Sequence, residues 1–168
     1  AVVPTEDPVP KDTSVPTEQP APAQLAPLKE NDKTGTVTPQ VTTKRYYRVT
    51  VRDGGTLQFG KVVIQLSGIA ARDADATCKD DKGKTWRCGA AAKAELARSI
   101  HGRAVTCALP KGGEHNVFLA RCSVGSTDLS TWLVRQGWAT PQETNEPALA
   151  KAAAAAKSDK LGQWRSAE

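Results

Sequence analysis

Apolar and polar residues alternate along residues 45–69 of this chain, and the alternation predicts three short strands. Residues 45–52 alternate with the period of two that is typical of a half-buried strand. Asp53-Gly54-Gly55 can turn the chain back tightly, because Asp and Gly tolerate a positive φ. Residues 56–59 alternate again, and the β-branched run within residues 61–69 favours a third strand. We therefore expect an antiparallel meander.

A helical spacing follows further along the chain. Ala92, Leu96 and Ile100 form an apolar stripe at the helical repeat and predict a helix over residues 89–101, which Gly102 can end. Two more helices are expected over residues 128–136, capped by Ser126 or Thr127, and over residues 148–160.

Two further strands are expected over residues 103–109 and 117–124. Five strands with helices after the third and fifth match an OB-type barrel. The expected fold is therefore α+β and mainly β: a five-stranded OB-type barrel with three flanking helices over residues 45–165. A single domain of this size can bury a real core.

The first 44 residues differ from the rest. They hold 8 of the 11 prolines, and their apolar residues are isolated and show no period. Such a composition cannot bury enough surface to offset the entropy of ordering, so we expect a disordered Pro-rich arm over residues 1–44. The arm could tether the domain to a membrane or wall, or it could be an idle tail.

Charge is spread unevenly over the chain, whose formal net charge is +5. Residues 1–44 carry 4 basic and 6 acidic residues, whereas residues 45–168 carry 19 basic and 12 acidic residues. A basic domain attracts polyanions such as nucleic acid or an anionic envelope polymer. A basic surface without any partner explains the charge equally well.

The chain contains 4 cysteines and 2 histidines, and no two cysteines form a CxxC pair. This argues against a structural zinc site, and an even number of cysteines suggests disulfides with three possible pairings. We favour Cys78–Cys88, which flank a polar loop, and Cys107–Cys122, which lie on two strands expected to pair. The chain begins Ala-Val-Val-Pro without a methionine and has no apolar run of membrane-spanning length. We expect an exported protein, periplasmic or secreted, whose signal peptide has been removed, or the soluble part of a protein that is anchored to a membrane upstream of residue 1.

Two segments carry a resemblance to a known family. Asp53-Gly54-Gly55-Thr56 and Gln65-Leu66-Ser67-Gly68-Ile69-Ala70-Ala71-Arg72-Asp73 resemble the thermonuclease, or staphylococcal-nuclease-like, signature of Asp-Gly-Asp-Thr followed by Arg-Leu-x-Gly-Ile-Asp-Ala-Pro-Glu. Later blocks such as Leu119-Ala120-Arg121 and Leu133-Val134-Arg135-Gln136-Gly137-Trp138 also resemble that family. The resemblance implies an OB-type barrel that hydrolyses phosphodiester bonds with Ca²⁺.

The resemblance also implies that the positions of the reaction centre have changed. Gly55 and Ala70 stand where the family places two calcium-binding aspartates. Gln65 stands at the first phosphate-binding arginine and Val117 at the second. Asp73 stands at the general-base glutamate, with a side chain one methylene shorter.

Two other residues are candidates for ligand binding. Arg72 replaces the proline of the family motif, and His115 stands where the family has a base-stacking tyrosine. We expect neither a catalytic residue nor a metal site, and Ca²⁺ only if the site has been rebuilt.

Three functions compete. The first is an inactive thermonuclease-like domain that binds a protein or an envelope polymer outside the cytoplasm. The second is a calcium-dependent nuclease with a rebuilt site. The third is a non-catalytic nucleic-acid-binding OB domain, which the small number of aromatic residues (4 Trp, 2 Tyr and 2 Phe) disfavours.

Overall fold

The computed structural model of the protein describes residues 40–111, 116–142 and 145–165. The strands of its main sheet are β1 (Val41–Tyr46), β2 (Thr50–Val51), β3 (Thr56–Phe59), β4 (Val62–Leu66), β8 (Val105–Pro110), β9 (Val117–Val124) and β10 (Thr127–Asp128). Two small ladders consist of β5 (Ile69–Ala71) with β11 (Ala139–Pro141), and of β6 (Cys78–Lys79) with β7 (Thr85–Trp86). The helices are α1 (Cys88–Ile100), α2 (Leu129–Arg135), α3 (Pro147–Ser158) and the 3₁₀ turn η1 (Gly162–Trp164).

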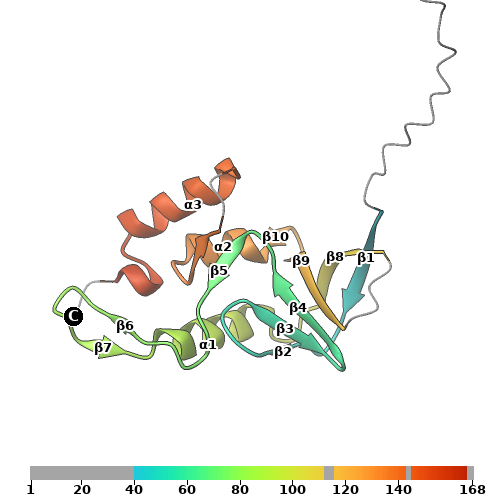
Figure 1. Ribbon diagram of the computed structural model, residues 1–168, viewed down its shortest axis with the longest axis horizontal. Helices are drawn as coiled ribbons and strands as arrows, with labels where there is room; N and C mark the ends of the chain where they lie inside the picture. The colour runs from blue at the N-terminus through green and yellow to red at the C-terminus, as the bar shows by residue number, and fades with distance from the viewer. Residues whose placement is uncertain (1–39, 112–115, 143–144, 166–168) are drawn as a thin grey trace, which may run out of the picture. The chain divides into compact units, whose positions relative to one another are not determined.

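The main sheet runs in the order β1-β8-β9-β4-β3-β2 (Figure 1). β2, β3 and β4 form the expected antiparallel meander, and β4 then pairs with β9 in parallel. The two edge strands, β1 and β2, are consecutive in the chain and are separated only by residues 47–49. The sheet therefore curls back on itself, although its hydrogen-bond ladder stays open between these two edges.

The predicted fold class is confirmed: the chain is mainly β with three helices, in the arrangement expected of an OB-like α+β domain. Two predicted strands differ from the structure. The strand expected within residues 61–69 ends at Leu66, and Ile69 begins β5, which pairs with β11. Residues 45–52 do not form a single strand, because the chain bends at Arg48, whose φ of 58° lies in the left-handed region. Strand structure also begins earlier than expected, at Val41 rather than at residue 45.

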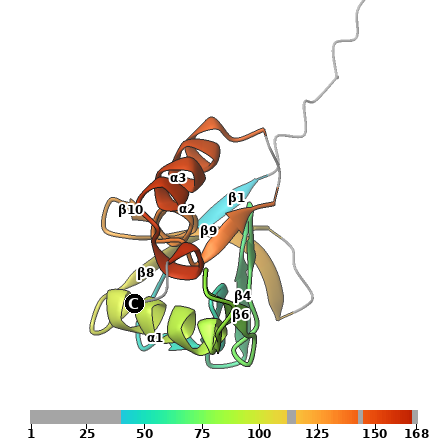
Figure 2. The same ribbon diagram turned by 90° about the vertical axis from the view of Figure 1, so that its left-hand side faces the viewer.

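The three helices occupy two places around the sheet. α2 and α3 pack against each other, while α1 lies apart from this pair and contacts β2 (Figure 2). The predicted stripe of Ala92, Leu96 and Ile100 is buried, as are Leu133 of α2 and Leu149 of α3. Each large aliphatic side chain taken fully out of water contributes roughly 1.5–3 kcal/mol before conformational entropy is counted. The helices therefore complete the core that the sheet begins.

The cap predicted for α2 is wrong. Neither Ser126 nor Thr127 caps the helix. Thr127 belongs to β10 and pairs with Val124 of β9. Asp128 is the N-cap instead, and its Oδ1 accepts a hydrogen bond from the backbone N–H of Ser130 at 3.0 Å.

Both favoured disulfides are present. Cys107 and Cys122 face each other across β8 and β9 with their Cα atoms 4.1 Å apart, which explains why paired strands predicted this bridge. Cys78 and Cys88 are also bonded, and their bridge ties the β6–β7 hairpin to the first residue of α1.

Residues 1–39 of the predicted N-terminal arm lie outside the described residues, and so does the candidate binding residue His115. Within the described part of the chain, no helix has the length and apolar character needed to cross a membrane.

Candidate functional site

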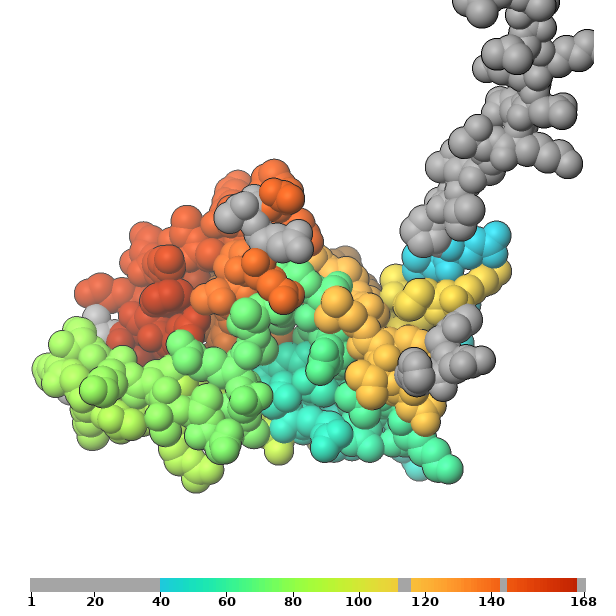
Figure 3. All heavy atoms as spheres, viewed as in Figure 1, coloured from blue at the N-terminus to red at the C-terminus, as the bar shows by residue number. Residues whose placement is uncertain are grey.

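A cavity of about 370 Å³ opens beside the Asp53 turn, between β4 and β5. Four of the positions predicted from the sequence line it together: Gly55, Gln65, Ala70 and Asp73. On the face shown in Figure 3, the green residues of β4 and β5 adjoin the orange residues of β9. The fifth position, Val117, lies on β9 opposite Val63 of β4 and does not line the cavity.

The turn at Asp53 forms one side of the cavity and is held by its own side chain. Asp53 Oδ1 accepts a hydrogen bond from the backbone N–H of Gly55 at 2.8 Å. This contact is the local capping that Asp commonly provides in turns, and it occupies one carboxylate oxygen. Asp53 therefore acts first as a structural residue of the turn.

Gly55 has no room for a side chain. A Cβ atom built on Gly55 would lie 2.5 Å from the Cβ of Ala71, closer than two such carbons approach in real structures. Ala71 is fixed in turn by β5, which pairs it with Ala139 of β11. A carboxylate at position 55 would thus require β5 to move away from the turn.

The wall formed by β4 and β9 is neutral and partly apolar. Gln65 is exposed and lies opposite Leu119, which also lines the cavity and keeps 60% of its surface exposed. Val117, two residues earlier on β9, is 57% exposed. No lysine or arginine is among the described residues that line the cavity. The wall therefore offers no guanidinium to neutralise a bound phosphate.

Asp73 is exposed and lies in the loop that leads to α1. Its backbone carbonyl accepts a hydrogen bond from Ala76 N at 3.0 Å, and the carbonyl of Ala76 accepts one from Gly89 N at 3.0 Å. These bonds fix the loop against the first turn of α1, which places Asp73 at the cavity.

The acidic residues of the cavity do not make a calcium site of the kind that the family motif supplies. Asp53 and Asp73 are the two acids that line it, and no cluster of three or more His, Cys, Asp or Glu side chains forms among residues 40–111, 116–142 and 145–165. Calcium takes six to eight oxygen ligands, with several carboxylates in its tighter sites. One oxygen of Asp53 is already engaged, so the acid set does not fit this ion.

The candidate binding residue Arg72 is engaged by another part of the protein. Its Nε donates a hydrogen bond to Oε1 of Gln163 at 2.7 Å, which links the segment after β5 to η1. Arg72 does not line the cavity, and its described contact is with another side chain of the protein.

Arg121 is a residue to which the sequence assigned no role, and it connects three elements near the cavity. From β9 its Nη2 contacts Asp128 Oδ2 at 2.6 Å, and its Nη1 contacts Glu146 Oε2 at 2.8 Å. Burial lowers the pKa of Arg121, but hydrogen bonds and attraction to Asp128 and then to Glu146 outweigh it and leave the pKa raised. An Arg on a strand followed by an acidic N-cap is the one signal that could have indicated this pair.

Comparison with known proteins agrees with the family resemblance of the sequence. Staphylococcal nuclease homologues match the chain over residues 63–166, which is more than half of its 168 residues. The succinoglycan biosynthesis protein ExoI of Rhizobium meliloti (strain 1021) is 27% identical to the chain over 121 residues. That match covers 70% of this chain and 63% of the relative, so the chain spans less than two thirds of that protein's length.

Proposed function

This chain belongs to the family of staphylococcal nuclease homologues, and from that premise we propose that it binds an acidic polymer outside the cytoplasm and does not hydrolyse nucleic acid. The proposal has two parts, the absence of hydrolysis and the nature of the polymer, and different observations support them.

The lining of the 370 Å³ cavity carries the proposal. It holds Gly55, Gln65 and Ala70 where the family resemblance calls for two carboxylates and an arginine, and the described lining has no basic side chain. Phosphodiester hydrolysis builds negative charge in its transition state, and losing one donor to such charge typically slows a reaction about 10²–10³-fold. The combined loss of charged groups and metal ligands would leave no useful rate.

Charge supports an acidic polymer as the ligand. Residues 45–168 hold 19 basic and 12 acidic residues, and an excess of this sign attracts polyanions over several ångströms of solvent. The relative in Rhizobium meliloti is named for the biosynthesis of succinoglycan, a name that refers to a glycan. An acidic glycan agrees both with the excess of basic residues and with the name of this relative.

Cysteine usage supports a location outside the cytoplasm. All 4 cysteines form disulfides, Cys78–Cys88 and Cys107–Cys122. Disulfides of this kind form and persist in oxidising compartments such as the periplasm or the extracellular space.

Native gel electrophoresis through gels that contain a dissolved polymer tests the binding. We expect polygalacturonate, an acidic glycan, to retard the protein at low salt, retardation to fall as salt is raised, and neutral dextran to have no effect. If no acidic glycan changes the mobility of the protein relative to a gel without polymer, the proposal is contradicted. Capture of a folded protein partner without any effect of acidic glycans would favour the protein-binding alternative instead.

A further inference from the structure

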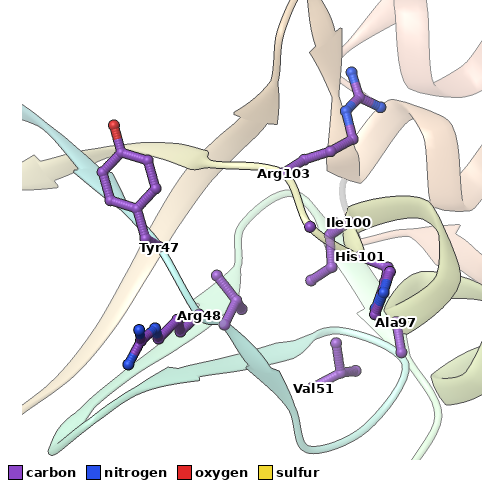
Figure 4. A pocket seen from close by; sticks show the side chains of 9 residues that line it. Tyr47, Arg48, Val51, Ala97, Ile100, His101 and Arg103 are labelled. Atoms are coloured by element: carbon purple, nitrogen blue, oxygen red, sulfur yellow. The ribbon is translucent and has the colours of Figure 1, made fainter.

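A second and larger hollow, of about 540 Å³, lies away from the nuclease-like cavity. It forms where the bend between β1 and β2 meets the C-terminal end of α1 (Figure 4). Its floor is apolar, because Val51 and Ile100 are buried with 7% and 4% of their surface exposed. Its rim carries the side chains of Tyr47, Arg48, His101 and Arg103.

The charge of this hollow is of one sign. Arg48 and Arg103 line it, and no Asp or Glu is among its described lining residues. Neither guanidinium makes a hydrogen bond or ion pair with another described residue. In Figure 4 the two arginine side chains extend outward from opposite sides of the hollow. The rim therefore presents two separated guanidinium groups that no described side chain or backbone group engages.

The backbone at this rim is strained. Arg48 has a φ of 58°, a left-handed conformation that Gly or Asn adopts more easily than arginine does. The bend leaves the ring of Tyr47 exposed over 66% of its surface. Strained non-glycine residues concentrate at binding and active sites, where the surrounding structure holds them in place.

A role in stabilising the fold explains only two of the four side chains at the rim. His101 is the C-cap of α1, and Arg103 follows it, where the positive charge of the guanidinium offsets the partial negative charge of the helix C-terminus. Tyr47 and Arg48 belong to a different segment and have no such role. A ligand that contacts both segments explains all four side chains.

The shape and chemistry of the hollow favour a sugar chain that carries carboxylates. An exposed tyrosine ring beside an aliphatic floor suits the apolar faces of pyranose rings, and separated arginines suit carboxylates spaced along an extended chain. Single-stranded nucleic acid needs successive aromatic platforms. Tyr47 is the sole aromatic residue in the described lining, so the hollow offers one such platform and not a succession of them.

We propose that the hollow between the β1–β2 bend and the end of α1 is the site at which this protein binds acidic saccharide chains. Tyr47 supports a sugar ring, and Arg48 and Arg103 bind carboxylates on opposite sides of it. The proposal rests on the function proposed above and assigns the binding to this hollow rather than to the nuclease-like cavity.

Isothermal titration with an oligogalacturonate of defined length tests the proposal, with the carboxyl-reduced oligomer as a neutral control of the same ring structure. We expect the acidic oligomer alone to bind. Tyr47→Ala and Arg103→Gln should each weaken binding about tenfold or more, because charge-assisted and stacking contacts are lost. Lys151→Gln removes one positive charge from an exposed position of α3 and should leave the affinity unchanged.

Arg48→Gly separates a binding role from a structural one. Glycine relieves the positive φ, so the variant should melt at the same or a higher temperature while binding the oligogalacturonate more weakly. A merely structural Arg48 would show no loss of affinity.

Three results would overturn parts of the account in distinguishable ways. This site would be overturned, but the proposed function would stand, if all variants of the hollow bound the acidic oligomer as tightly as the wild type. The same holds if the oligomer caused amide chemical-shift changes centred on Gln65 and Leu119. No binding of the acidic oligomer by the wild type would overturn the proposed function as well. Binding of a single-stranded oligonucleotide with the same dependence on Tyr47 and Arg103, but not of the glycan, would overturn the saccharide assignment.

Discussion

Ala71 occupies the space that any side chain at position 55 would need. The Cβ of Ala71 lies 2.5 Å from where a Cβ of Gly55 would stand, and Ala71 is held in place by its pairing with Ala139 of β11. The packing around position 55 thus leaves no space for a carboxylate side chain. Restoring the missing acid by a single substitution would disturb the fold before it could create a metal site.

Gly55→Asp should therefore destabilise the protein and fail to confer calcium binding. Overpacking of this kind costs about 1–3 kcal/mol of the free energy of unfolding. Thermal or denaturant unfolding measures the loss. Gly55→Ala should show a similar loss, and adding Ala71→Gly should recover part of it by vacating the contested space. An equally large loss in the double variant would show that Ala71 is not the cause.

Asp128 should matter more to stability than an ordinary surface acid. It caps α2 through Ser130 N and accepts two hydrogen bonds from Arg121, at 3.0 and 2.6 Å. Asp128→Ala should lower the free energy of unfolding by about 1–3 kcal/mol. The loss of the cap accounts for about 0.5–2 kcal/mol of this. The ion pair contributes the smaller part, because it is partly exposed and screened.

Glu95→Gln provides the comparison, since Glu95 pairs with the exposed Arg98 one turn along α1. This change should alter the free energy of unfolding by less than about 0.5 kcal/mol. Equal effects of the two substitutions in urea titrations would refute the special role of Asp128.

Tyr46 should ionise at higher pH than a free phenol. Burial raises its pKa above the ordinary value of 10.0, and its ring stacks on Phe59 with centroids 4.0 Å apart. The chain has 2 tyrosines, so Tyr47→Phe leaves Tyr46 as the only phenol to be followed by ultraviolet absorbance. We expect a titration midpoint above pH 10 in the folded protein and a lower one in denaturant.

The same shift fixes the sign of a stability effect. The folded state holds the Tyr46 proton more tightly than the unfolded state, so its contribution is intact below pH 10 and is lost as pH rises further. Tyr46→Phe should make the alkaline loss of stability shallower. An unchanged alkaline profile would contradict the assignment.

The two disulfides should differ in their resistance to reduction. Cys107 and Cys122 are buried, with 0% and 2% of their surface exposed, whereas Cys78 is only half-buried in a surface hairpin. A thiol reductant needs access to sulfur, so under native conditions it should reduce Cys78–Cys88 first. Alkylation followed by peptide mass mapping identifies the bond that opens. Simultaneous reduction of both bonds would contradict the difference in access.

The sequence predicted features that rest on local patterns. The Cys107–Cys122 bridge followed from two neighbouring strands that were expected to pair, and the buried stripe of Ala92, Leu96 and Ile100 followed from helical spacing. The grouping of Gly55, Gln65, Ala70 and Asp73 around one cavity followed from the family resemblance, because the spacing of the motif is retained.

Features that depend on tertiary packing could not be predicted in this way. The bend at Arg48 contradicts the local preference of an arginine, and Thr127 was lost as a helix cap because it joins a strand. The contact of Arg72 with Gln163 spans 91 residues of sequence, and no local pattern indicates it. The hollow beside Tyr47 likewise combines the β1–β2 bend with the end of α1, which lie about 50 residues apart in the chain.

We propose that this member of the nuclease family does not cleave nucleic acid. Incubation of the purified protein with fluorescently labelled single- and double-stranded DNA and RNA, with calcium present and with chelator as the control, tests it most directly. We predict no cleavage with calcium, with chelator or with the Asp73→Ala variant. Calcium-dependent cleavage that Asp73→Ala abolishes would contradict the account.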